Sequence, residues 1–140
     1  MSREAEPLVL LAEDDEDDAF LLQEALKNDG WRGRLDRVRD GEELLEVLRA
    51  GTRPDLILLD LDMPRKDGRQ ALAEIKRDEE LRVIPVIVLT TSAAEVDVLG
   101  AYRAGANSYM VKCSECETLT RLLRVLGSYW FEACVLPPLR

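Results

Sequence analysis

The sequence contains no histidine among its 140 residues. This absence excludes Ser-His-Asp triads, Cys-His dyads, His-ligated zinc and an imidazole base for general acid–base catalysis. Any chemistry must therefore use carboxylates, hydroxyls, lysine, thiols or a bound metal. The chain also has only three cysteines, an odd number placed late in the sequence, which argues against the disulfide framework of a secreted protein.

Long hydrophobic runs are also missing. No apolar stretch approaches the roughly 18 residues that a membrane-spanning helix needs, and MSREAEP at the start is no signal peptide. The 28 acidic residues outnumber the 19 basic ones and give a net charge of −9, which argues against non-specific binding to nucleic acid or an anionic membrane. We expect a soluble cytoplasmic protein of one compact domain, because 46% hydrophobic residues can supply a core.

Short apolar runs alternate with amphipathic stretches along the chain. The apolar runs predict five strands, and apolar residues at helical spacing follow each of them. The expected strands are 8–12, 34–39, 57–59, 86–89 and 108–111, and the expected helices lie around 20–26, 44–48, 71–75, 94–104 and from 115 onward. Strict alternation of this kind indicates an α/β fold, a doubly wound five-stranded parallel sheet covered by helices on both faces.

In such a sheet the functional site lies beyond the carboxyl ends of the strands. Glu13, Asp14 and Asp15 follow the first expected strand, and Asp60 and Asp62 follow the third. Two such charges about 4 Å apart repel by roughly 1 to 4 kcal/mol, so the cluster needs a cation, and hard oxygen ligands favour Mg²⁺. In the alternative interpretation, the acids after the first strand are solvated loop residues or helix N-caps.

Hydroxyl and amino groups follow the last two expected strands. Thr90, Thr91 and Ser92 follow the fourth strand, and Lys112 follows the fifth. The hydroxyls could donate to an anion or cap the next helix, and the lysine could reach a phosphate or be an ordinary surface charge. Acids, metal, hydroxyl and lysine together describe a site that neutralises a transferred phosphoryl group, which a carboxylate can accept as an aspartyl phosphate.

The motifs at these positions resemble those of two-component response-regulator receiver domains. DLILLDLDMPRKDG resembles the phosphoacceptor signature, AEDD the acidic pair, VLTTSA the switch threonine and SYMVK the lysine segment. The spacing agrees, since Thr90 lies 30 residues after Asp60 and Lys112 lies 22 residues after Thr90. The resemblance covers about residues 7–126 and implies the flavodoxin-like strand order 2-1-3-4-5. We expect a receiver domain over 1–126 and a C-terminal extension over 127–140.

The resemblance implies a phosphoacceptor and a metal site. Asp60 would accept the phosphoryl group from a sensor histidine kinase. Mg²⁺ would be bound by Glu13, Asp14, Asp60 and the backbone carbonyl of Asp62. Asp15 is an alternative metal ligand, because the acidic run leaves the register ambiguous by one residue. The protein would then be a phosphoacceptor in signalling rather than an enzyme with a substrate of its own.

The resemblance also implies a switch. Thr90 would move toward the phosphoryl oxygens, and Lys112 would pair with them. Tyr109 matches the aromatic position that swings inward on activation, and the response would reach the face formed by the fourth helix, fifth strand and fifth helix. A tyrosine at position 109 is also expected if this is only a half-buried aromatic residue of a strand. The sequence does not distinguish the switch residue from this structural role.

One position departs from the family pattern. The family usually has proline after the lysine, often through a cis peptide bond, whereas Cys113 follows Lys112 here. A cis bond before a residue other than proline costs about 2.5 to 4 kcal/mol, so a trans bond is expected and the geometry of this loop is in question. Cys113 and Cys116 could form a redox pair or half a metal site, but ordinary thiols are the default interpretation.

Three other functions agree less well with the sequence. Asp60-Leu61-Asp62 has the D-x-D spacing of haloacid-dehalogenase phosphatases, but Pro64 stands where a Thr or Val is typical. A receiver-shaped module that is never phosphorylated would lack an acceptor, metal ligand, threonine or lysine, and all four are present. An FMN-binding flavodoxin is disfavoured because EDDEDD would repel a phosphate.

The C-terminal segment GSYWFEACVLPPLR extends the apolar stripe of the last helix. The acidic first loop and this aromatic tail resemble the small regulators partnered with bacterial and cyanobacterial phytochrome kinases, so a phytochrome-type kinase and a downstream protein are the expected partners. A tail folded onto its own domain is the alternative to a dimer. We expect a homodimer through Leu119, Leu122, Leu126, Tyr129, Trp130 and Phe131.

Overall fold

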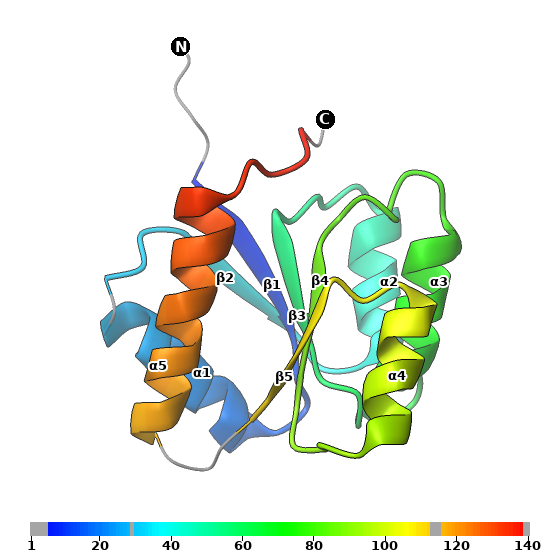
Figure 1. Cartoon of the computed structure of the whole chain (residues 1–140). Coiled ribbons are helices and arrows are strands. Elements are labelled where there is room, and N and C mark those ends of the chain that lie inside the picture. Colours follow the sequence, from blue (N-terminus) through cyan, green and yellow to red (C-terminus); the bar gives the residue numbers. More distant parts are fainter. Residues whose placement is uncertain (1–5, 29, 113–115, 139–140) are drawn as a thin grey trace.

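The strands form one parallel sheet in a computed structural model that describes residues 6–28, 30–112 and 116–138. The sheet has five strands in the order β2-β1-β3-β4-β5, and every neighbouring pair is parallel (Figure 1). The predicted fold class and strand order are therefore confirmed. The strands are β1 (Leu8–Ala12), β2 (Arg34–Val38), β3 (Leu56–Leu59), β4 (Val86–Thr90) and β5 (Ser108–Val111).

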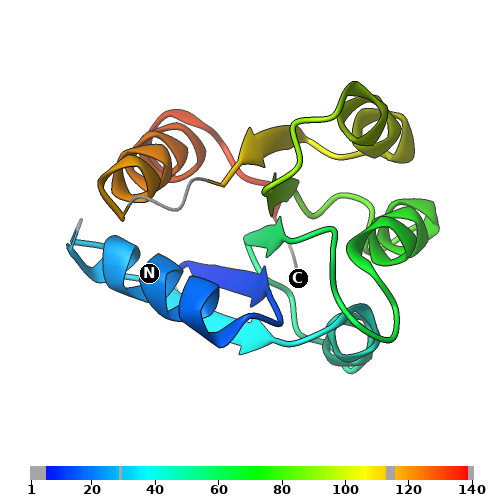
Figure 2. The ribbon, with the colours of Figure 1, turned by 90° about the horizontal axis from the view of Figure 1, so that it is seen from below.

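Helices cover both faces of the sheet. Viewed along the strands, α1 and α5 lie on one face, and α2, α3 and α4 lie on the other (Figure 2). Among the described helices, none is both long enough and apolar enough to cross a membrane. The helices are α1 (Glu16–Asn28), α2 (Gly41–Arg49), α3 (Gly68–Arg77), α4 (Glu95–Ala104) and α5 (Cys116–Gly127).

The strands are apolar on both faces because each face meets a helical layer. Side chains alternate along a strand, so Leu10 and Ile57 pack in the cluster beneath α2 and α3, whereas Val9 and Leu58 pack in the cluster beneath α1 and α5. Every residue of β3 is buried. This explains why the central strands read as continuous hydrophobic runs rather than alternating ones.

The register of the sheet brings the strand ends together. Ala12 pairs with Leu59 across β1 and β3, and Thr90 pairs with Val111 across β4 and β5. The next residues continue this pattern, since the Asp60 N–H donates to the Ala12 carbonyl at 3.1 Å and the Lys112 N–H donates to the Thr90 carbonyl at 2.7 Å. The polar residues that follow the strands therefore share one edge of the sheet.

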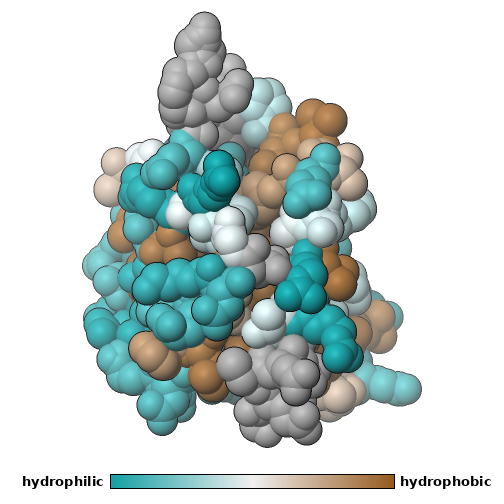
Figure 3. Space-filling model, turned by 90° about the vertical axis from the view of Figure 1, so that its left-hand side faces the viewer, coloured by the Kyte–Doolittle hydropathy of each residue, from teal (hydrophilic) through white to brown (hydrophobic). Residues whose placement is uncertain are grey.

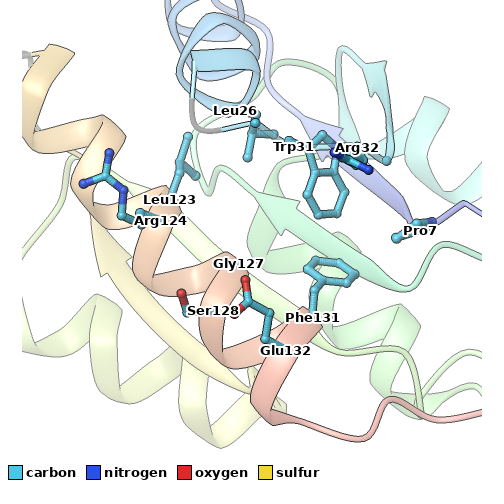
Figure 4. A pocket seen from close by; sticks show the side chains of 12 residues that line it. Pro7, Leu26, Trp31, Arg32, Leu123, Arg124, Gly127, Ser128, Phe131 and Glu132 are labelled. Atoms are coloured by element: carbon cyan, nitrogen blue, oxygen red, sulfur yellow. The ribbon is translucent and has the colours of Figure 1, made fainter.

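The tail packs against its own domain at the opposite edge. After α5, a π-helical segment η1 (Ser128–Ala133) continues the chain. Phe131 lies edge-on to Trp31, with ring centroids 4.7 Å apart, and both rings line a cavity of about 370 Å³ between α5, η1 and the loop before β2 (Figure 4). Phe131 and Trp130 also pack against the core beneath α1 and α5. Trp130 and Phe131 therefore follow the alternative in which the tail folds onto its own domain.

Burial corrects two of the expected dimer contacts. Leu119 and Leu126 are only 3% and 4% exposed, and both pack in the protomer's own core. They are therefore not accessible to a partner. Leu122 is half-buried and Tyr129 is 55% exposed.

On the side of the molecule shown in Figure 3, hydrophobic residues reach the surface in separate patches among mostly hydrophilic ones.

Candidate functional site

Three carboxylates meet at the carboxyl edge of the sheet. Glu13 and Asp60 are 1% and 7% exposed, and Asp14 is exposed. One oxygen from each lies within 4.8 Å of the others, a separation that a single cation can bridge. The predicted cluster therefore exists, and it combines two buried acids with one that faces solvent.

The loop after β1 explains which acids join the cluster. The Glu13 N–H donates to the Val38 carbonyl at 3.0 Å, and Arg37 donates from Nε to the Glu13 carbonyl at 2.9 Å, so this loop is tied to β2. Asp15 instead caps α1, because its Oδ1 accepts from the Asp18 N–H at 3.0 Å. Asp14, rather than Asp15, accompanies Glu13 and Asp60 in the cluster.

Lys112 reaches into the same cluster from β5. Its ammonium group donates to Glu13 Oε1 at 2.7 Å and to Asp18 Oδ2 at 2.8 Å, and it lies 3.6 Å from Asp60 Oδ2. The side chain is only 7% exposed, so the lysine is not an ordinary surface charge. Asp18 was missed by the sequence analysis, although it belongs to the first turn of α1, directly after the acidic loop.

Burial and neighbouring charges shift the pKa values of Glu13 and Lys112, which are hydrogen-bonded to each other. Burial, with the nearby Asp60 charge, raises the pKa of Glu13 to about 7 despite the hydrogen bond from Lys112. Burial opposes the charge of Lys112, but its hydrogen bonds to Asp18 and Glu13 outweigh that effect and raise its pKa above the ordinary value. A cation at the cluster would oppose the burial penalty on Glu13 and favour its carboxylate form.

Thr90 provides a buried hydroxyl at the same edge of the sheet, where its carbonyl accepts from the Lys112 N–H. It ends β4, is 0% exposed, and its Oγ1 has no hydrogen-bond partner among the described residues. Leaving a buried hydroxyl unpaired costs roughly 1 to 3 kcal/mol. Helix capping, the alternative for this group of hydroxyls, is not what they do, since the N-cap of α4 is Ala94 and has no side-chain hydrogen bond. Ser92 Oγ instead accepts from the Ala94 N–H at 3.2 Å and donates to Asp97 at 2.6 Å.

Tyr109 is half-buried on β5 and is hydrogen-bonded to the loop between β4 and α4. Its hydroxyl donates to the Ser92 carbonyl at 2.9 Å, and burial raises its pKa. Asp62 is largely exposed, and its carboxylate pairs with Arg69 at 3.3 Å. Arg69 also binds Asp97 at 3.0 Å. Arg69 of α3 therefore links the loop after β3 to α4, and Tyr109 links β5 to the loop after β4.

The donor set fits a hard divalent cation. Carboxylate oxygens are the ligands that Mg²⁺ and Mn²⁺ prefer, and Glu13, Asp14 and Asp60 supply them at one point. The expectations about Cys113 lie outside the described residues, as do those about the side chain of Cys116. Cys134, the described cysteine, is free.

The fold and this site together define a receiver-type signalling domain. The family model of the response regulator receiver domain matches residues 9–124, and the chain belongs to that family. Membership removes the phosphatase and flavodoxin alternatives, since neither is a receiver domain.

Two similar proteins, Rcp1 and RcpA, match almost the full length of the chain. Response regulator Rcp1 of Synechocystis sp. is 41% identical over 145 residues, covering 98% of this chain and 99% of Rcp1. The crystal structure of the phosphorylated cyanobacterial phytochrome response regulator RcpA is 40% identical, with a TM-score of 0.90 and coverage of 96% and 100%. The Mn²⁺-bound form of Rcp1 has 40% identity, a TM-score of 0.87 and coverage of 94% and 99%.

Proposed function

We propose that this protein is a response regulator that accepts a phosphoryl group on Asp60 from a phosphohistidine of a sensor histidine kinase, with Mg²⁺ bound by Glu13, Asp14 and Asp60. The observation that carries the proposal is the convergence of these carboxylates with Lys112 at the edge where Thr90 ends β4. The Asp62 backbone carbonyl is proposed as a further metal ligand.

The chemistry follows from the charges at the site. A carboxylate oxygen of Asp60 forms the bond to phosphorus while the bond from phosphorus to the donor nitrogen breaks, and the nitrogen keeps the electron pair. Mg²⁺, when bound, neutralises charge on the phosphoryl oxygens and on the acids that surround them. Lys112, held 3.6 Å from Asp60, supplies a second positive charge beside the carboxylate.

The unpaired hydroxyl of Thr90 supports a role in the response. A phosphoryl oxygen on Asp60 would give this buried donor an acceptor, and that gain favours a shift of Thr90 toward the site. Because the Tyr109 hydroxyl binds the Ser92 carbonyl two residues after Thr90, a shift of this loop would reach Tyr109 and the face of α4, β5 and α5.

The proposed kinase is of the phytochrome type. Support comes from RcpA, which is described as a phytochrome response regulator and matches almost the whole chain. Rcp1 also matches almost the whole chain, at 41% identity. Phosphoryl transfer from an autophosphorylated phytochrome kinase, compared with transfer from an unrelated sensor kinase, tests this partner.

The central test is intact-protein mass after incubation with acetyl phosphate and Mg²⁺. We expect one phosphoryl group on the wild-type chain, none after chelation of Mg²⁺, and none on the Asp60→Asn variant, because the amide cannot act as acceptor. Asp17→Asn is the matched control, since Asp17 is an exposed acid in the first turn of α1 and lies outside the cluster. An unmodified wild-type chain, or an adduct that persists in Asp60→Asn, would contradict the proposed function.

We also propose a homodimer through the exposed part of α5 and η1, where Val125 and Tyr129 are 60% and 55% exposed. Aromatic anchors dominate many interfaces, so Tyr129→Asp should weaken dimerisation at least about tenfold in light-scattering measurements across micromolar concentrations. Val83→Asp, between α3 and β4, changes an exposed apolar residue elsewhere and should leave the dimer intact. A wild-type mass that stays monomeric throughout this range would rule the homodimer out.

A further inference from the structure

The loop that follows Asp60 is fastened to the start of α2 by a two-pronged ion pair. Arg65 donates from Nε to Asp40 Oδ2 at 2.9 Å and from Nη2 to Asp40 Oδ1 at 3.0 Å. The two parallel hydrogen bonds fix the direction of the guanidinium as well as its distance. The residues involved are 25 positions apart in the sequence, so the contact joins two separate strand-end loops.

Asp40 is itself held firmly in place. It is the N-cap of α2, and its Oδ1 accepts from the Glu43 N–H at 2.9 Å. The hydrogen bond from Arg65 lowers the pKa of Asp40, so this carboxylate remains charged at neutral pH. Because Asp40 is nearly buried and bound from two sides, it offers Arg65 a rigid acceptor.

The backbone reinforces the same junction. The Gly41 N–H donates to the Lys66 carbonyl at 2.8 Å. A Cβ atom at Gly41 would lie 2.3 Å from that carbonyl oxygen, so only glycine allows the two segments to approach this closely. Contact between the loop and α2 therefore involves main chain and side chains together.

Arg65 adopts an unusual backbone conformation. Its φ is 61°, and among the described residues it is the only one other than glycine with a positive φ. For an L-residue with a long side chain this left-handed conformation is strained. The ion pair with Asp40 offsets that strain, since it holds the residue in a conformation that it would otherwise leave.

The segment enclosed by these contacts is residues 61–67. At its other end, the Gly68 N–H donates to the Leu61 carbonyl at 2.9 Å, and a Cβ at Gly68 would lie 2.2 Å from the Asp60 carbonyl oxygen. Near its start, the Asp62 N–H donates to Asp60 Oδ1 at 3.3 Å. The loop thus begins at the acceptor carboxylate and ends at two fixed points.

We propose that the Arg65–Asp40 pair is a positioning device that holds loop 61–67 in the shape needed to bind the divalent cation. The inference rests on the proposed function, because the cation is the Mg²⁺ of the phosphoacceptor site. Without the pair, Arg65 leaves the left-handed conformation and the loop must be ordered when the cation binds, which weakens binding. Groups that orient metal ligands without touching the metal commonly change affinity by about 10- to 100-fold.

Two variants separate this role from helix capping. Asp40→Asn keeps an amide oxygen for the Glu43 N–H and remains a good N-cap, but it lacks the charge that pairs with Arg65. Arg65→Gln removes the guanidinium and leaves a side chain that, like arginine, does not favour the left-handed backbone. The matched control is Arg34→Gln, which breaks an exposed ion pair with Asp36 at the start of β2, away from loop 61–67.

The measurements are Mg²⁺ affinity by titration calorimetry and amide hydrogen exchange of residues 61–67 in the metal-free protein. Each variant should bind Mg²⁺ about tenfold more weakly and exchange the loop amides several-fold faster, while unfolding stays cooperative. The double variant should be little worse than either single one, because both remove the same contact. Arg34→Gln should match the wild-type chain in both measurements.

Unchanged Mg²⁺ affinity and unchanged exchange in both variants, with a reduced free energy of unfolding, would show that the pair only stabilises the fold and would overturn the inference. A wild-type chain that does not bind Mg²⁺ would overturn the proposed function instead. The exchange measurement needs no metal, so it still decides whether the pair holds the loop.

Discussion

Replacing Lys112 by methionine is expected to slow phosphoryl transfer to Asp60 by about 100- to 1,000-fold, the range found when one preorganised charge or donor is removed from a reacting oxyanion. Lys112 is nearly buried and lies 3.6 Å from Asp60 Oδ2, so water cannot readily replace its charge there. Methionine keeps most of the side-chain volume and cannot carry a proton. The rate of phosphoprotein formation from acetyl phosphate at saturating Mg²⁺ measures the effect.

The same variant should bind Mg²⁺ several-fold more tightly. Lys112 donates to Glu13 Oε1 at 2.7 Å and therefore competes with a cation for a carboxylate that belongs to the metal cluster. Without the ammonium group, the buried acids repel one another more strongly in the metal-free protein, and a dication relieves more of that repulsion. Calorimetric titration with Mg²⁺ provides the affinity.

Lys112→Arg serves as the comparison, because it keeps the positive charge with a different shape. It should retain near-wild-type Mg²⁺ affinity and lose less of the transfer rate than Lys112→Met. If methionine lowers the transfer rate and the Mg²⁺ affinity together, Lys112 acts by supporting the acidic cluster rather than by stabilising the transferred group.

The fold could be predicted from the sequence because local signals agree with the tertiary structure. Residues 86–89 combine β-branched and apolar side chains and form a strand buried on both faces. Asp60 directly follows a buried apolar strand, and in a parallel sheet that position fixes where the side chain lies. For the same reason, Glu13 and Lys112 could be placed at one edge before any contact was known.

Other parts of the site depend on contacts that no local pattern specifies. Asp18 meets Lys112 only because α1 is rotated so that this acid, rather than Asp17, faces the sheet edge. The Arg65–Asp40 pair joins two loops and requires a left-handed residue that the sequence does not mark with glycine. The apolar face of α5 does not by itself indicate whether it packs in the protomer's core or against a second copy. For this reason the sequence predicts dimer contacts at Leu119 and Leu126, which lie in the core.

A Thr90→Val substitution is expected to stabilise the metal-free protein by about 1 kcal/mol and to abolish its conformational response to phosphorylation. Valine has nearly the same shape as threonine and removes a buried hydroxyl that has no partner among the described residues. An unpaired buried hydroxyl costs roughly 1 to 3 kcal/mol, so its deletion should raise the free energy of unfolding in urea. Thr91→Val, at the exposed neighbouring position, should change neither property.

The response is measured by hydrogen exchange of the β4–α4 loop and α4, with and without a beryllofluoride mimic of the phosphoryl group. In the wild-type chain, the mimic should alter exchange there, because an acceptor oxygen at Asp60 draws the Thr90 hydroxyl toward it. In Thr90→Val the mimic should still bind Asp60, since Lys112 and the metal ligands remain, but exchange in this segment should stay as it was. A variant less stable than the wild-type chain would show that the hydroxyl is already paired, and a preserved response would assign the switch to another group. Thr90→Val should therefore gain stability in the unphosphorylated protein and lose the response to phosphorylation. The Thr90 hydroxyl destabilises the unphosphorylated state, and it is useful because the phosphorylated state supplies its hydrogen-bond acceptor.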